Sequence, residues 1–178
     1  MNKKAGWKKV KQKVENEKKQ DLIKLIADLY RESEDVQLFL NSRYLRETVS
    51  MKALKKSIFK ALSPDDSYNG NLKWHEAADV VKNYRLASQD QTGVAELMVY
   101  YMEVANQFTL DYGDIDEDYY DTAVGWFEKT ARYVKALKKK DAKAADFIER
   151  LRNTVDSTEG IGWGYHDGLC EVFFKHFE

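Results

Sequence analysis

The sequence is poor in the residues that form disulfides and structural metal sites. It contains one cysteine, Cys170, three histidines and one proline in 178 residues. A single cysteine excludes an intramolecular disulfide, and no pair or cluster of cysteines indicates a structural zinc site. A chain without disulfides is typical of a reducing compartment, so we expect a cytoplasmic protein.

Long hydrophobic runs are also missing. No segment approaches the roughly eighteen consecutive apolar residues that a membrane-spanning helix requires. The N-terminus begins with positive charge but has no apolar segment behind it, so it does not resemble a signal peptide. The sequence therefore predicts that a membrane is not a partner.

Recognisable catalytic motifs are equally scarce. The sequence has no Gly-x-Ser-x-Gly motif, no second histidine to complete a zinc helix after His75, and no pattern that pairs a cysteine with a histidine. Cys170 lies in a strongly apolar segment, which is typical of a packing residue. These features disfavour an enzyme and indicate no cofactor and no metal.

The dominant pattern in the sequence is the spacing of apolar residues at the period of a helix. Charged residues make up 33% and hydrophobic residues 43%, a balance typical of helices with one apolar side. Across residues 92–133 apolar residues recur at spacings of three and four, interrupted by an acidic turn at residues 111–113. This spacing predicts a helical hairpin at the centre of the fold.

The same spacing recurs along the rest of the chain. Further helices are expected at about residues 5–19, 22–31, 34–44, 48–62 and 74–88, and again after residues 141 and 164. The expected caps are Ser33, Asp90 or Thr92, and Asp141. Residues 65–71, which include Asn-Gly, are the clearest turn.

The sequence therefore predicts an all-α fold without a sheet. We expect a single compact array of about eight or nine antiparallel helices, arranged as helical hairpins. Residues 1–20 are expected to form a loosely attached lysine-rich helix, because its apolar stripe is narrow, and residues 21–178 a single all-α domain.

Positive charge is concentrated at the N-terminus, although the net charge is only −1. Lys8, Lys9, Lys11 and Lys13 lie in one short stretch and are the candidates for contact with a polyanion. A solvated lysine face is the alternative interpretation. The first twenty residues contain no arginine and no interleaved aromatic platform, so any binding of nucleic acid there is expected to be weak and nonspecific.

The acidic segment at residues 111–121 is a second candidate. Asp114, Asp116 and Asp118 match positions one, three and five of a calcium loop, but Tyr119 and Gly125 occupy the positions that require glycine and glutamate. The simpler interpretation is that these carboxylates cap the helix that follows.

The glycine-rich segment at residues 160–169 is the third candidate. It lacks both the dinucleotide fingerprint and the phosphate-loop ending, so a tight turn in which Trp163 fills the core is the simpler interpretation. If this turn meets the acidic one in space, a small-ligand or divalent-metal site is expected. Its residues would be Asp114, Asp116, His166, Asp167 and Trp163.

Three segments resemble a family of uncharacterised bacterial proteins, a domain of unknown function. The first is LIADLY at 25–30 with LFL at 38–40 and SRY at 42–44. The second is VAELMVYY at 94–101 with FTLDYGDID at 108–116, and the third is GWGYHD at 162–167. The resemblance covers nearly the whole chain after residue 20. It implies a helical, cytoplasmic protein and supplies no activity.

The sequence as a whole favours a noncatalytic protein-interaction module that binds another protein or a second copy of itself. Two alternatives remain open. One is contact with nucleic acid through the lysine-rich helix, and the other is the small-ligand or divalent-metal site at the two polar turns.

Overall fold

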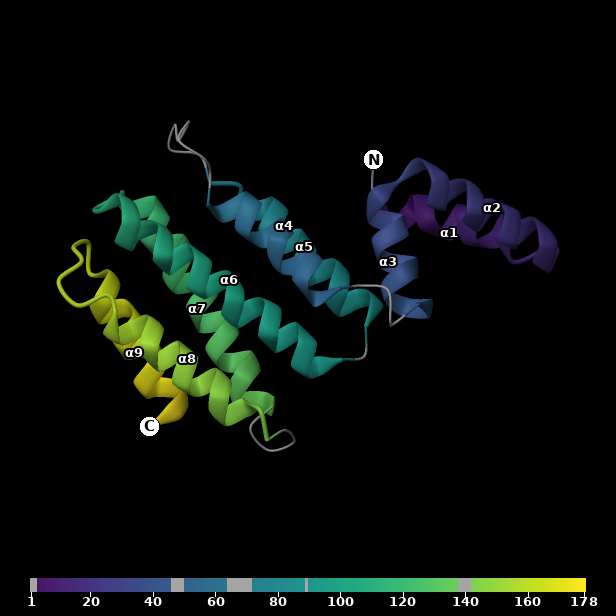
Figure 1. Cartoon of the computed structure of the whole chain (residues 1–178). Coiled ribbons are helices and arrows are strands. Elements are labelled where there is room, and N and C mark those ends of the chain that lie inside the picture. Colours follow the sequence, from purple (N-terminus) through teal and green to yellow (C-terminus); the bar gives the residue numbers. More distant parts are fainter. Residues whose placement is uncertain (1–2, 46–49, 64–71, 89, 138–141) are drawn as a thin grey trace.

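A computed structural model of the chain describes residues 3–45, 50–63, 72–88, 90–137 and 142–178 (Figure 1). Within these residues the chain forms helices and no strand, which confirms the prediction of an all-α fold. None of the described helices is long and apolar enough to cross a membrane. The helices are α1 (Lys3–Val14), α2 (Lys19–Glu32), α3 (Glu34–Tyr44), α4 (Met51–Leu62), α5 (Trp74–Ala87), α6 (Gln91–Tyr112), α7 (Glu117–Leu137), α8 (Ala144–Asp156) and α9 (Tyr165–Phe177).

Helix α6 is the centre of the fold, as the sequence predicts. It packs closely against α4, α5, α7 and α8 and buries side chains on more than one side. Of the two predicted caps, Asp90 is the one used: its carboxylate accepts from the Gly93 amide at 2.9 Å. The helix continues to Tyr112, so the turn lies at residues 113–116 and not at 111–113 as predicted. Gly113 follows the helix, and its φ of 83°, which favours glycine, lets the chain reverse into α7.

The six helices α4–α9, which we call the bundle, form three hairpins side by side (Figure 1). They are α4 with α5, α6 with α7, and α8 with α9, and neighbouring hairpins pack through α4 with α6, α6 with α8 and α7 with α9. Each closely packed pair joins helices that are one or two places apart along the chain. Burial of apolar residues between the hairpins forms a continuous core that includes Tyr101, Phe127, Leu151 and Leu169.

Helices α1–α3, which we call the arm, extend from one end of the bundle (Figure 1). Helix α3 packs against α5, and α2 packs against α3. Ser33 separates α2 from α3 and accepts from the Val36 amide at 3.4 Å, so the predicted cap is confirmed. Helix α1 stops earlier than predicted, at Val14, because the Asn16 side chain donates to the Gln12 carbonyl, which a further helical turn would otherwise use.

The structure leaves several sequence predictions untested. The predicted turn at residues 65–71 and the predicted cap Asp141 lie outside the described residues. The domain boundary after residue 20 stays a prediction. In the described packing, the whole arm and not α1 alone is joined to the bundle through α3.

A cluster of charged residues ties three helices of the bundle together. The Arg150 guanidinium, from α8, donates to Glu103 at 2.7 and 2.8 Å and to Glu96 at 2.8 Å, both on α6. Lys55, from α4, pairs with Glu96 on its other side. Burial opposes ionisation of Glu96, but its bonds to Arg150 and Lys55 outweigh burial and hold its pKa below the ordinary value.

Candidate functional site

The two polar turns are neighbours in space. A Cβ atom added to Gly162 would lie 3.3 Å from Oδ2 of Asp114, so the glycine turn rests directly on the acidic one. The Tyr120 hydroxyl holds the acidic turn in place: it accepts from the Ile115 amide and donates to Asp114, each at 3.2 Å. The two turns are therefore in contact at Gly162 and Asp114.

The candidate ligands nevertheless make separate contacts. Asp116 accepts from the Tyr119 amide at 2.8 Å, so it caps α7 as the simpler interpretation predicts. Asp167 is exposed in the first turn of α9. The described residues include no group of three His, Cys, Asp or Glu side chains placed to hold a metal ion. The two turns thus give the metal hypothesis no ligand set, and a small-ligand site there stays a prediction.

The prediction that Trp163 fills the core is wrong. Trp163 is 58% exposed and has a positive φ of 58°, while Tyr165, two residues later, is fully buried. The Tyr165 ring packs on Tyr120 with the two ring centroids 4.8 Å apart. Tyr165 therefore occupies the core position that was expected for Trp163.

The structure also pairs a cysteine with a histidine, which the sequence analysis did not detect. In α9, His166 Nε2 lies 3.4 Å from Cys170 Sγ, and His166 Nδ1 lies 3.0 Å from Thr158 Oγ1. Thr158 gives its hydrogen to the Val155 carbonyl at 2.7 Å, so Nδ1 is the donor to Thr158 and Nε2 accepts from the thiol.

That Cys170 thiol is not poised as a nucleophile. Burial raises its pKa, and the nearby negative charges of Asp167 and Asp156 raise it further. The proton therefore stays on sulfur, where it serves the bond to His166. This environment supports the interpretation of Cys170 as a packing residue.

The lysine-rich stretch forms α1, as predicted. Lys8, Lys9, Lys11 and Lys13 are all exposed on this helix, and Lys11 pairs with Glu15 at 3.2 Å. The nearby Trp7 side chain is 63% exposed. Whether this helix contacts a polyanion stays a prediction.

Helix α2 carries apolar side chains that the fold leaves uncovered. None of its fourteen residues is buried. Leu25, Ile26 and Leu29, which we call the α2 face, are 45%, 47% and 49% exposed. With Leu22 they recur at the spacing of one helix side, which in the bundle helices is buried.

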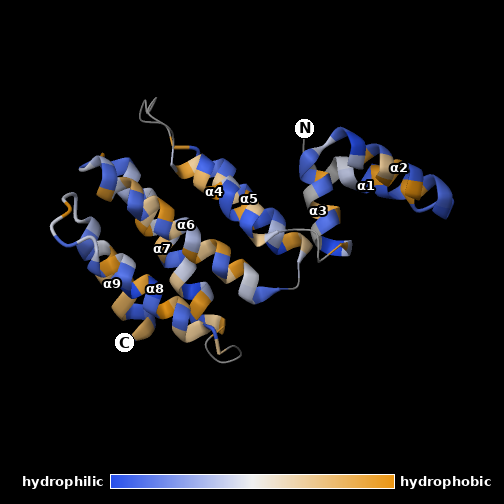
Figure 2. Cartoon of the chain, in the orientation of Figure 1, coloured by the Kyte–Doolittle hydropathy of each residue, from blue (hydrophilic) through white to orange (hydrophobic). Residues whose placement is uncertain are grey.

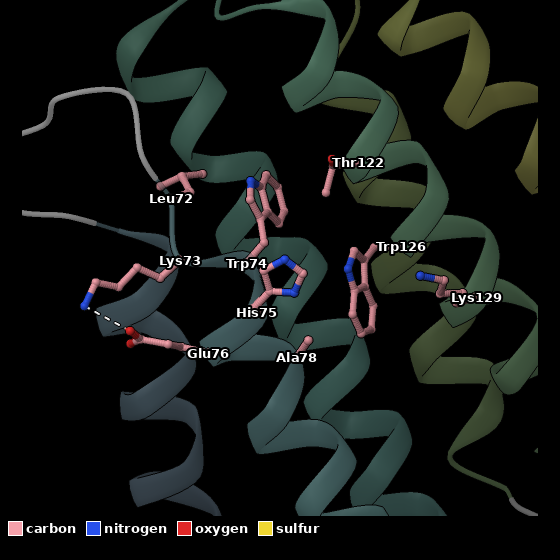
Figure 3. Close-up of a pocket in the computed structure, with 9 residues that line it drawn as sticks. All are labelled: Leu72, Lys73, Trp74, His75, Glu76, Ala78, Thr122, Trp126 and Lys129. Carbon is pink, nitrogen blue, oxygen red and sulfur yellow. Dashed lines mark ion pairs between the residues drawn. The ribbon is translucent and has the colours of Figure 1, made fainter. Parts of the chain in front are cut away.

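A groove that the sequence did not predict lies between α5 and α7, which are not among the closely packed helix pairs. One hollow of about 520 Å³ is edged by the indoles of Trp74, from α5, and Trp126, from α7 (Figure 3). A second hollow of about 630 Å³ continues it along the same helices. Both share Ala78, Trp126 and Lys129, so we treat them as one feature, the α5–α7 groove.

Helical spacing explains how the groove arises. Trp74, Ala78, Lys82 and Arg85 lie on one side of α5, and Thr122, Trp126, Lys129, Arg132, Tyr133 and Ala136 lie on one side of α7. The sequence of each helix by itself shows the spacing of three and four that places these residues on one side. The sequence gives no sign, however, that these two sides face each other across α6.

No family model, no curated protein sequence and no solved structure matches the chain. The resemblance to a domain of unknown function therefore stays a prediction, and any function has to be argued from the geometry of the molecule itself.

Proposed function

We propose that the protein is a protein-interaction module, and that its arm binds an acidic amphipathic helix of a partner protein. The α2 face carries this proposal. An apolar helix side of this kind is normally covered, because water contact with leucine and isoleucine is unfavourable. Figure 2 shows hydrophobic residues along α2, in the part of the molecule that stands away from the bundle.

The size of the uncovered face supports a helix as the occupant. The residues of the α2 face span little more than one helical turn, and Leu22 and Ile23 extend the apolar side to about two turns. Fully burying an exposed leucine or isoleucine is worth roughly 1.5–3 kcal/mol, so half-exposed side chains contribute about 1 kcal/mol each. A partner helix with apolar residues at the same spacing matches this side.

Charge favours an acidic partner over a second copy. The exposed lysines of α1 lie in the same arm as the α2 face, with Lys8, Lys9 and Lys13 having no described carboxylate in ion-pair distance. A symmetric pair of arms would bring two such lysine clusters together, and like charges repel. Glutamates flanking the apolar side of a partner helix would instead be attracted.

The test uses the whole chain and a designed peptide of about eighteen residues, with leucines at the spacing of one helix side and glutamates elsewhere. We expect saturable binding by fluorescence anisotropy, and amide shift changes in α1 and α2 by NMR. The double variant Leu25→Glu/Leu29→Glu should weaken binding at least tenfold. Leu110→Glu is the matched control, since Leu110 is 41% exposed on α6, and it should leave binding unchanged.

Three results would contradict the proposal. One is equal binding of a peptide with the same composition but scrambled order. Another is binding that Leu25→Glu/Leu29→Glu does not weaken. The third is a concentration-dependent dimer of the free chain, detected by light scattering, that this same double variant dissociates, because the α2 face would then belong to a second copy.

A further inference from the structure

We infer that the α5–α7 groove binds a short single-stranded nucleic acid, independently of the arm. The inference rests on two properties that occur together along the groove: cationic side chains at its rim and aromatic rings in its walls. Single-strand binding proteins combine these two, because phosphates need cations and bases stack on aromatic rings.

The rim of the groove is strongly positive, although the chain as a whole is not. Its charged lining residues are Lys73, Glu76, Lys82, Arg85, Lys129 and Arg132. Lys73 and Glu76 pair with each other at 3.1 Å, and Lys82 pairs with Asp79 at 3.4 Å. Among the described residues, no carboxylate lies within ion-pair distance of the remaining three cations. Three positive charges are thus free for an anionic ligand.

The aromatic rings lie beside these cations. Trp126 stacks on the buried Tyr101 ring, with 4.4 Å between the ring centroids, and the Lys129 ammonium lies 4.7 Å from the centroid of the same indole. Because Tyr101 occupies one face of Trp126, Lys129 covers the other. Two helical turns further along α7, the Arg85 guanidinium lies 5.5 Å from the Tyr133 ring centroid.

This arrangement favours nucleic acid over an acidic peptide. An exposed cation–π contact is worth only about 0.5–1 kcal/mol, so Lys129 and Arg85 can leave the rings for phosphates. A base can then take the vacated ring face, where stacking is worth about 1–3 kcal/mol. An acidic peptide would satisfy the cations but would leave Trp126 and Tyr133 without flat partners.

The dimensions of the groove set the length of the ligand. From Trp74 to Arg85 the α5 wall extends about 16 Å at 1.5 Å per residue. A strand with a rise of about 3.4 Å per nucleotide fits about five nucleotides in that length. Figure 3 shows the Trp74 end, where Lys73 and Glu76 pair with each other and Lys129 is the remaining cation, so most of the phosphates are expected towards Arg85 and Arg132.

The test measures anisotropy of a labelled eight-nucleotide oligothymidine with the full chain at 50 and 200 mM salt. With three phosphates neutralised, the logarithm of the binding constant should fall with the logarithm of salt at a slope of about −2. Arg85→Glu/Arg132→Glu should raise Kd at least tenfold and Trp126→Ala at least fivefold. Trp126→Phe, which keeps an aromatic ring, should change Kd less than threefold while removing most of the quenching of tryptophan fluorescence.

The matched control is Lys8→Glu/Lys9→Glu in α1, which makes the same change of charge outside the groove and should alter Kd less than twofold. Circular dichroism melts confirm that each variant is folded. No binding of the oligonucleotide would overturn the inference, and so would a larger loss in the α1 variant than in the groove variant. Equally tight binding of a polyglutamate of the same charge, insensitive to Trp126→Ala, would overturn it in favour of an acidic peptide.

Discussion

The arm and the bundle are built from helices of similar pattern but contrasting burial. Helix α2 in the arm and α8 in the bundle both alternate apolar and charged residues at the helical period. In α8 the apolar side, including Phe147 and Leu151, is almost completely buried, whereas α2 buries no residue. A side chain in α8 therefore contributes to folding, while the equivalent one in α2 is available for binding.

The strongest way to test this contrast is to remove one large apolar side chain from each region. Phe127→Ala in α7 should lower the free energy of unfolding by about 4 kcal/mol, because the Phe127 side chain is fully buried and its loss leaves a cavity. Leu25→Ala in α2 should change it by less than about 0.5 kcal/mol. Urea unfolding followed by circular dichroism measures both. A loss of similar size in the two variants would show that the α2 face is covered in solution.

A second test concerns the charged cluster, which the arm lacks. Arg150→Met should cost about 2 kcal/mol at pH 7, since it leaves Glu96 and Glu103 without their shared partner in a partly buried position. The matched control is Arg152→Met on the same helix. Arg152 pairs with Glu178 at the surface, where both side chains are about half exposed, so the cost should be at most about 1 kcal/mol.

The same cluster gives the bundle a specific pH dependence. The pKa of Glu96 is lower in the folded chain than its ordinary value, so the unfolded chain binds more protons as the solution is acidified. The stabilisation is complete above the ordinary glutamate pKa of about 4.3 and is lost as pH falls through the folded value. Stability should thus fall less steeply below about pH 5 in Arg150→Met than in the parent chain. An equally steep fall would contradict the role given to Arg150.

The smallest expected difference comes from the two helix caps. Asp90→Ala removes the cap of α6 and should cost about 1 kcal/mol of global stability, because α6 lies at the centre of the bundle. Ser33→Ala removes the longer cap bond in the arm and should accelerate amide hydrogen exchange only in the first turn of α3. Native-state hydrogen exchange measures both effects. If Ser33→Ala accelerated exchange throughout the bundle, the arm and the bundle would unfold as one unit.

Much of this fold follows from local sequence patterns. Apolar spacing predicts the helices, and the residues at Ser33, Asp90 and Gly113 mark helix ends, since capping and left-handed geometry depend on chemistry within a few residues. The contact between the two polar turns could not be predicted from the sequence, because it depends on how the hairpin of α6 and α7 packs against the next one, of α8 and α9.

Other features depend on three-dimensional packing and were missed or predicted wrongly. Trp163 and Tyr165 are both aromatic and two residues apart, so the sequence pattern does not distinguish which of them the packing buries. The groove requires two helices to face each other across a third. The uncovered α2 face is clear as a pattern, but a pattern does not say whether another helix covers it.

The order in which the helices pack affects how the chain finds its fold. Because every closely packed pair of described helices joins helices one or two places apart, folding closes loops that span at most a few helices, and the entropy cost of closure grows only slowly with loop length. Proteins with such sequence-local contacts fold within microseconds to milliseconds. Any of the three hairpins can serve as a starting point, and the others can add to it one after another, as repeats do in a solenoid. Few partly folded chains would then persist long enough to aggregate.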